Sequence, residues 1–247
     1  MGLSCINTTF NAKMELQVPI NEKYSQNISS EIIIFTTFVR TLNKNTMLVN
    51  FTFQNFRSFR DEKTLSMEAG SIKELKESVI QKESYRLLPA AVMYGANSSG
   101  KSNVLLALMT MRRVLLGSVR LNPNDELYFQ PFKLDLTSAN TPTSFEIQFL
   151  LDDVKYRYGF DYDKTHICKE WLYEKCAGQR EFNLFLRVDN EFEVSKTRFP
   201  EGLGKEGVTP SNRLFVSLVA QLNGAKSMRI LDWFNNCNYL SGMDSLG

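Results

Sequence analysis

The sequence is poor in the residues that build metal centres. It contains one histidine, His166, and four cysteines, Cys5, Cys168, Cys176 and Cys237, with no CxxC spacing among them. Structural zinc sites draw their ligands mostly from cysteine and histidine. The composition therefore offers little from which to build a zinc site, and it is typical of a protein whose thiols stay reduced in the cytoplasm.

Neither charge nor hydrophobic length points to a nucleic-acid or membrane partner. Lys and Arg number 29 against 27 Asp and Glu, so the formal net charge of +2 gives no strong field of either sign. A membrane span needs about 20 consecutive apolar residues, and the longest apolar run near the N-terminus is IIIFTTFV, over residues 32–39. With 43% hydrophobic residues, we expect a globular cytoplasmic protein without a membrane partner.

The chain changes character at Met47. Residues 1–46 are polar and sparse in charge, and they lack a clear period apart from the apolar run already named. From Met47 the segment MLVNFTFQNFRSF alternates apolar and polar residues, which predicts a half-buried strand, and KTLSMEA at 63–69 predicts its hairpin partner. We expect residues 1–46 to be an extension or an upstream translated segment, and residues 47–247 to form the domain.

A strand, a glycine-rich loop and a helix follow one another in the middle of the chain. The apolar run LLPAAVMY at 87–94 predicts a buried strand. The segment SNVLLALMTMRRVLLG at 102–117 is apolar around most of its circumference and ends at a glycine, as a buried helix does. The charged segment 72–86 before them is expected to be a solvated connection or a short helix.

The residues after this helix predict antiparallel strands followed by helices. PTSFEIQFLLDDVKYRYGFDYD at 142–163 contains two alternating strands around an Asp-Asp turn. Further strands are predicted at 166–175, 181–188 and 191–197, and two helices within 211–237. The predicted fold class is mixed α/β, with an antiparallel β lobe over residues 128–197 beside a P-loop sheet.

The segment GANSSGKS at 95–102 matches the Walker A pattern at every defined position. Its glycines let backbone N–H groups turn inward around a β-phosphate. Lys101 would bring a mobile charge to the β- and γ-phosphates, and Ser102 would place a hydroxyl on Mg²⁺ at a helix N-terminus. A Gly/Ser linker that matches by accident is expected in about one chain of this length in a hundred, and the flanking strand and helix make it rarer. The predicted nucleotide-binding residues here are Gly95, Ala96, Asn97, Ser98, Ser99, Gly100, Lys101, Ser102 and Asn103.

Together these segments resemble a known family. FQNFRSF upstream of AAVMYGANSSGKSNVLLAL, followed by FEIQF, YRYGF and EWLY, resembles the ABC-type ATP-binding heads of the SMC/RecF/OLD group. The likeness covers about 47–240 and is greatest to bacterial AAA-family ATP-binding proteins of anti-phage and abortive-infection systems. Ser98 stands where many SMC-like members have glycine. The resemblance implies a P-loop NTPase fold of the ABC head type that binds ATP and Mg²⁺.

The resemblance also implies three further contacts to the nucleotide. Arg57 and Ser58 of FRSF would lie near it, although this segment could equally be a strand end with packed aromatic residues. Gln221 would be the glutamine that touches Mg²⁺ and the attacking water, although it could equally be a polar residue on a helix surface.

The carboxylate that would cleave ATP is harder to find. Such heads use a Walker B strand that ends in Asp-Glu, and a signature helix donated by a second head. QFLLDD at 148–153 imitates Walker B, but Asp152 and Asp153 are better explained as a hairpin turn between alternating strands. YLSGMDSLG at 239–247 imitates the signature but lacks its second glycine and reads as a polar turn. We therefore expect the N-terminal half of a head, whose catalytic residues are unknown.

Two functions remain open at this point. The first is ATP binding by an SMC/OLD-like ATPase in DNA processing or anti-phage defence, with hydrolysis impaired in this chain alone. Its partners would be a second head or a missing C-terminal half, with DNA or an effector nuclease beyond them. The second is a non-catalytic nucleotide-binding or interaction module. A P-loop kinase or GTPase is disfavoured, because those folds continue as parallel βα units.

Overall fold

The computed structural model describes residues 33–35, 46–70, 79–82, 84–93 and 99–237. Within these ranges the chain has a mixed α/β fold, with one large antiparallel sheet, smaller strand pairs and helices packed on one face. This fold class agrees with the prediction from the sequence.

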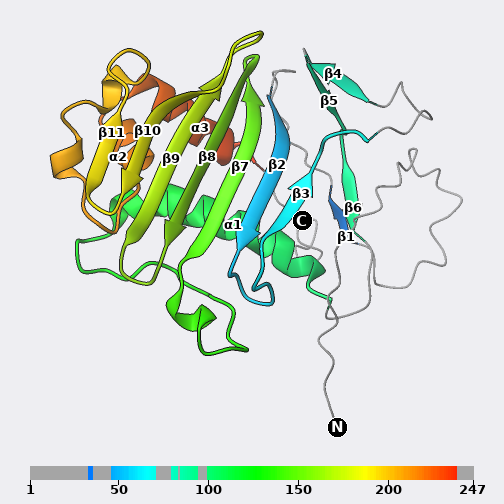
Figure 1. The fold of residues 1–247 in the computed structure, drawn as a ribbon, viewed down its shortest axis with the longest axis horizontal. Helices are drawn as coiled ribbons and strands as arrows, with labels where there is room; N and C mark the ends of the chain where they lie inside the picture. Colours follow the sequence, from blue (N-terminus) through cyan, green and yellow to red (C-terminus); the bar gives the residue numbers. More distant parts are fainter. Residues whose placement is uncertain (1–32, 36–45, 71–78, 83, 94–98, 238–247) are drawn as a thin grey trace, which may run out of the picture.

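In the described part of the chain, seven strands form one antiparallel sheet in the order β11-β10-β9-β8-β7-β2-β3 (Figure 1). The strands are β2 (Thr46–Gln54), β3 (Lys63–Ser66), β7 (Thr143–Leu151), β8 (Val154–Tyr162), β9 (Ile167–Lys175), β10 (Phe182–Val188) and β11 (Glu191–Val194). The predicted hairpin after residue 47 and the predicted antiparallel strands after residue 142 are both present. They are joined into a single sheet because β2 pairs with β7 along its whole length.

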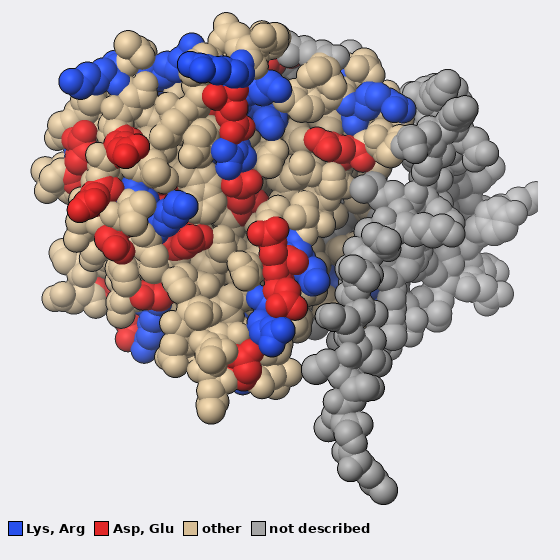
Figure 2. Space-filling model, in the orientation of Figure 1, with Lys and Arg blue, Asp and Glu red and all other residues tan. Residues whose placement is uncertain are grey.

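Alternation of side chains builds the core of this sheet. Phe145, Ile147 and Phe149 of β7 are fully buried, while Glu146 and Gln148 between them are only partly buried. This is the period of two expected for a strand with one covered face. The other face carries Lys, Arg, Asp and Glu side chains interspersed with one another (Figure 2), which agrees with a net charge of only +2.

In the part of the chain that the structure describes, three α-helices cover the buried face: α1 (Lys101–Gly117), α2 (Phe215–Gln221) and α3 (Ala225–Asn235). Figure 1 shows α1 running across the sheet, with α2 and α3 toward the β11 end. Trp233 of α3 stacks on Phe149 of β7 with ring centroids 4.3 Å apart, and Phe215 of α2 meets Phe185 of β10 edge to face at 5.0 Å. Such aromatic pairs add specific geometry to the burial of apolar area.

Helix α1 is the central helix of the fold. Its buried residues Ala107, Leu108, Met111, Val114 and Leu115 recur at helical spacing and belong to the main core. Among the described residues, the stretch Lys101–Arg120 is also the one helix long and apolar enough to cross a membrane by length and composition. The buried core helix of a soluble protein has the same composition, and this stretch packs against the sheet.

Two small strand pairs lie outside the large sheet in the described residues. One is β1 (Ile33–Phe35) with β6 (Ala91–Met93), and the other is β4 (Ile80–Lys82) with β5 (Tyr85–Leu87); both are antiparallel. The prediction of a connection or short helix over 72–86 was therefore wrong for its described residues, which form a hairpin. The predicted strand at 87–94 is divided, because Pro89 separates β5 from β6.

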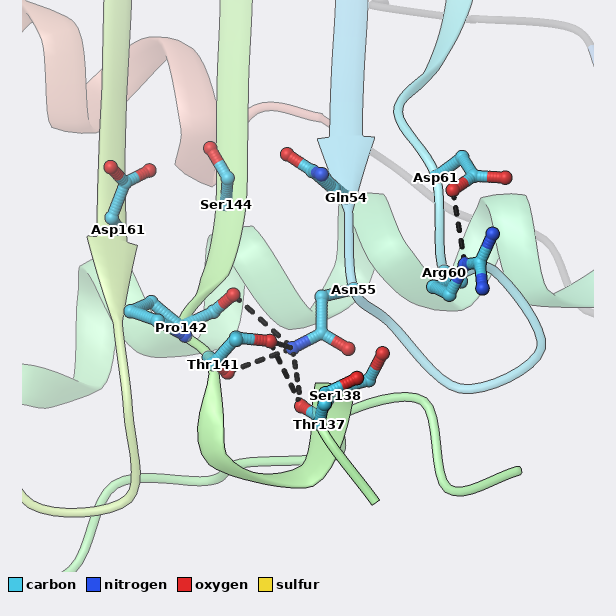
Figure 3. Close-up of a pocket in the computed structure, with 10 residues that line it drawn as sticks. All are labelled: Gln54, Asn55, Arg60, Asp61, Thr137, Ser138, Thr141, Pro142, Ser144 and Asp161. Atoms are coloured by element: carbon cyan, nitrogen blue, oxygen red, sulfur yellow. Dashed lines mark hydrogen bonds and ion pairs between the residues drawn. The ribbon is translucent and has the colours of Figure 1, made fainter. Parts of the chain in front are cut away.

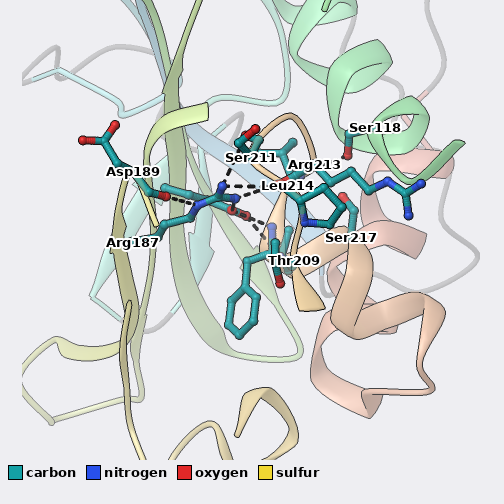
Figure 4. A network of polar contacts seen from close by, with 12 residues as sticks. Ser118, Arg187, Asp189, Thr209, Ser211, Arg213, Leu214 and Ser217 are labelled. Atoms are coloured by element: carbon teal, nitrogen blue, oxygen red, sulfur yellow. Dashed lines mark hydrogen bonds and ion pairs between the residues drawn. The ribbon is translucent and has the colours of Figure 1, made fainter. Parts of the chain in front are cut away.

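A buried ion pair connects the sheet to α2. Arg187 of β10 and Glu170 of β9 are fully buried with Nη1 and Oε2 3.9 Å apart. Glu170 accepts the N–H groups of Phe215 and Val216 at 2.6 and 3.1 Å. Arg187 donates to the carbonyls of Arg213 and Asp189 at 2.7 and 2.6 Å (Figure 4). Burial raises the pKa of Glu170 and lowers that of Arg187. The chain just before helix α2 supplies carbonyls to Arg187, from Pro210, Ser211 and Arg213.

Candidate nucleotide-binding site

The second half of the Walker A segment is built into the start of α1. Gly100 precedes the helix with φ 93°, in the left-handed region that favours glycine. A Cβ at Gly100 would lie 3.0 Å from Cζ of Phe59 and 3.1 Å from Oγ of Ser58. The backbone conformation therefore favours glycine here, and a Cβ would also be in tight contact with the FRSF turn. Gly95, Ala96, Asn97 and Ser98 lie outside the described residues.

The first turn of α1 carries the groups that a phosphate needs. Lys101 is 8% exposed, Ser102 is exposed, and the turn contains no acidic residue. The first N–H groups of a helix have no partner within the helix, and the helix dipole places partial positive charge on them. With no acidic side chain in this turn, that charge is available to an anion.

The FRSF segment folds as a tight turn against this helix start. Phe56 and Phe59 exchange backbone hydrogen bonds of 2.8 and 2.9 Å, and Arg57 between them has φ 51°. Ser58 Oγ accepts a 2.8 Å hydrogen bond from Nδ2 of Asn103. The structure thus brings Ser58 together with Asn103 and Gly100. Arg57 is exposed, and its N–H donates to the carbonyl of Gln130 at 2.9 Å.

Asn55 fixes the position of this turn, and sequence reasoning missed it. It is 4% exposed with φ 52°. Its Nδ2 donates to the carbonyls of Ser138 and Thr141 at 2.9 and 2.8 Å (Figure 3). Its Oδ1 accepts the N–H of Phe132 at 3.0 Å. An Asn directly after an alternating strand could have given the signal, because Asn tolerates the left-handed region and bonds nearby backbone.

A polar pocket of about 560 Å³ lies beside Asn55, at the ends of β2, β7 and β8. Figure 3 shows Gln54, Ser144 and Asp161 at these strand ends above the loop 137–142. Burial raises the pKa of Asp161. Arg60 and Asp61, directly after the FRSF turn, complete the lining, and none of the described Walker A residues belongs to it.

The structure does not bring Gln221 to this site, which corrects its interpretation as a magnesium-contacting glutamine. Helix α2 packs at the far end of α1, where Ser217 Oγ donates to the carbonyl of Leu115 at 2.6 Å. Leu115 is fourteen residues beyond Lys101, or about 21 Å at 1.5 Å per residue. Gln221 is exposed at the end of α2, as the helix-surface alternative expects.

Asp152 and Asp153 form a hairpin turn, as the sequence predicted. They separate β7 from β8, and both have positive φ, 49° and 62°, as in a two-residue type I′ turn. Leu151 beside the turn pairs with Thr46 at the start of β2, whereas the FRSF turn follows the other end of β2. Eight residue steps along the strand place the two turns about 27 Å apart. The imitation signature at 239–247 lies outside the described residues.

Comparison with known families agrees with this architecture. Residues 90–244 match the model of the AAA domain described as AbiEii toxin-like, type IV TA system. The match covers more than half of the chain, so the chain belongs to this family of AAA domains. It is therefore an ATP-binding, ATPase-like module, a class that binds nucleotide typically with Mg²⁺. A search of curated proteins finds no match.

Proposed function

We propose that this chain binds Mg·ATP at the start of α1 and hydrolyses it poorly on its own. The contact that carries the proposal is the hydrogen bond from Asn103 to Ser58, beside the left-handed Gly100. It unites two segments 45 residues apart on the helix turn where a phosphate would bind. Family membership accounts for nucleotide binding in general, and this contact supports the assignment of particular residues to the binding site.

Each residue has a role that suits its surroundings. Backbone N–H groups of residues 95–100 would surround the β-phosphate, Lys101 would neutralise the β- and γ-phosphates, and Ser102 would ligate Mg²⁺. Ser58 would hold the FRSF turn against the loop. Arg57, exposed on that turn, would reach the phosphates from outside it.

Poor hydrolysis follows from where the candidate carboxylates lie. Phosphoryl transfer needs a carboxylate to hold Mg²⁺ and another to orient water beside the γ-phosphate. Asp152 and Asp153 are at the opposite end of the sheet from Ser58. Binding would survive without such a carboxylate, whereas turnover would mostly be lost. A second head or another polypeptide would then complete the site.

The proposed biological role rests on the resemblance to known families. The resemblance of FQNFRSF and GANSSGKS to SMC/RecF/OLD heads, with the toxin-like description of the matched family, supports a role in DNA processing or anti-phage defence. DNA or an effector nuclease would be the partner.

We place the domain at 47–247, with 1–46 as an extension whose strand β1 pairs with β6. Peptides from residues 1–46 in the natural protein would exclude an upstream translation artefact.

Unfolding and turnover measurements separate the two parts of this proposal. Mg·ATP at 100 times its Kd should stabilise the chain by about 2.7 kcal/mol. Lys101→Ala should remove this stabilisation, and Lys196→Ala, an exposed lysine after β11, should keep it. Turnover should stay far below about 1 s⁻¹. Turnover at or above that rate in the purified chain, abolished by Lys101→Ala, would refute the proposal of impaired hydrolysis. Equal stabilisation of the two lysine variants by Mg·ATP would refute the proposed binding site.

A further inference from the structure

Four side chains of mixed chemistry meet at one end of the sheet, between the β8–β9 turn and the β10–β11 turn. Asp163, His166 and Cys168 each place one ligand atom within 4.8 Å of the others. Asp189 enters from the neighbouring turn, with Oδ1 3.7 Å from Nε2 of His166. His166 and Asp163 are 37% and 33% exposed and Asp189 is 66% exposed, so an ion can reach them from solvent.

Asp163 sets the orientation of the imidazole. Its Oδ1 accepts the N–H groups of Thr165 and His166 at 2.6 and 2.9 Å, and its Oδ2 lies 3.1 Å from Nδ1 of His166. With Nδ1 against the Asp163 carboxylate, Nε2 is the ring nitrogen left to contact a metal ion. This is the arrangement found behind metal-binding histidines.

Nε2 of His166 has two further ligand atoms around it at the spacing of metal ligands. Cys168 Sγ and Asp189 Oδ1 are each 3.7 Å from Nε2. Tetrahedral zinc with ordinary bond lengths separates nitrogen from sulfur by about 3.6 Å and nitrogen from oxygen by about 3.4 Å. At 3.7 Å, Nε2 of His166 and Oδ1 of Asp189 leave room for a metal ion between them. A proton on Nε2 would also bring the two groups together, and the experiment below separates the two.

Backbone hydrogen bonds hold these ligand atoms in place. Asp189 has φ 51°, and its N–H donates to the carbonyl of Cys168 at 2.9 Å. Arg187 Nε donates to the carbonyl of Asp189 at 2.6 Å, while the Asp189 carboxylate points away from Arg187 (Figure 4). Because Arg187 is itself fully buried and paired with Glu170, the turn that presents Asp189 is anchored to the core.

We infer that His166, Cys168 and Asp189 bind a divalent transition-metal ion of the Zn²⁺ class, with Asp163 orienting the histidine. One nitrogen, one sulfur and one oxygen ligand suit Zn²⁺ or Co²⁺ better than Mg²⁺ or Ca²⁺, which prefer oxygen. The thiol gives its proton to solvent as the sulfur–metal bond forms, and water takes the fourth position. The site is distinct from the nucleotide site and needs no nucleotide.

Cobalt titration of the untagged full chain, stripped with chelator and kept reduced, tests this site. Co²⁺ should bind one per chain with a thiolate-to-cobalt charge-transfer band, and Zn²⁺ should displace it. Cys168→Ser should lose that band, and His166→Ala should weaken binding at least tenfold. Asp163→Asn, which removes the orienting charge, should weaken it about 10- to 100-fold. Cys176→Ser, at a half-buried cysteine outside the cluster, should bind like the original chain.

Alkylation with peptide mapping gives a second readout that does not depend on the variants folding. Zn²⁺ should protect Cys168 from iodoacetamide and leave Cys176 reactive. Absence of a cobalt charge-transfer band, an unchanged band in Cys168→Ser, or equal protection of both cysteines would each overturn the site. The first of these outcomes would leave a proton as the cation beside Nε2.

Discussion

Replacing Gly100 with alanine is the sharpest test of how the phosphate loop is built. Gly100 has φ 93° and ψ 3°, and a left-handed conformation costs an alanine about 1–2 kcal/mol. The new Cβ would lie 3.0 Å from Cζ of Phe59 and 3.1 Å from Oγ of Ser58. The side chains of Phe59 and Ser58 must shift by a few tenths of an ångström to make room. The hydrogen bond from Asn103 to Ser58 is then expected to be strained, at a cost of about 1 kcal/mol.

The total of about 2–3 kcal/mol corresponds to about 30- to 150-fold weaker Mg·ATP binding. We expect this cost to weaken nucleotide binding, because the loop of the alanine variant can relax in the free protein. To surround a phosphate, the loop must return to the strained backbone conformation. A part that persists without nucleotide should appear in the free energy of unfolding. Both quantities are therefore measured, by titration with a fluorescent ATP analogue and by urea unfolding.

Gly117→Ala is the matched control. Gly117 ends α1 with φ −95°, and a Cβ there would meet nothing within 4 Å. The change should leave ATP binding unaltered and the free energy of unfolding within about 1 kcal/mol of the original. If Gly100→Ala binds ATP and unfolds like Gly117→Ala, the described loop geometry is not the one that holds nucleotide.

Two further predictions concern stability and thiol chemistry. Arg187→Met should lower the free energy of unfolding in urea by about 3–5 kcal/mol, because it leaves the Glu170 carboxyl buried without its partner. Arg60→Met, at a 60% exposed side chain, should lower it by at most about 1 kcal/mol. Equal losses in the two variants would show that the buried ion pair contributes no more to stability than an exposed arginine. Burial and nearby carboxylates raise the pKa of Cys168 to about 11. Its thiolate fraction at pH 8 is then about 0.1%, against about a quarter for an ordinary thiol. Metal-free alkylation of Cys168 should therefore speed up about tenfold per pH unit between pH 8 and pH 10, and a plateau below pH 9 would contradict the raised pKa.

Local patterns predicted most of the architecture. The alternation of Phe145, Ile147 and Phe149 with polar residues gave β7, and the Asp152–Asp153 pair gave its turn. The apolar circumference of 102–117 gave α1. Each of these elements is determined by a hydrophobic period or a turn signal within one short segment, so tertiary contacts did not change the local preference.

Features that depend on contacts between distant segments were missed. The charged segment before Leu87 gave no sign of the β4–β5 hairpin, because short strands rely on partners more than on propensity. Asn55 acts through a loop more than 80 residues away. The proximity of Asp189 to Cys168 was also not predicted, because it depends on the pairing of neighbouring strands.

Calorimetric titration of Mg·ATP into the purified chain tests the central claim most directly. We expect saturable binding of one nucleotide per chain, with affinity at least tenfold lower in Lys101→Ala and unchanged in Lys196→Ala. Absence of saturable binding, or equal affinity in all three proteins, would contradict the nucleotide site at the start of α1.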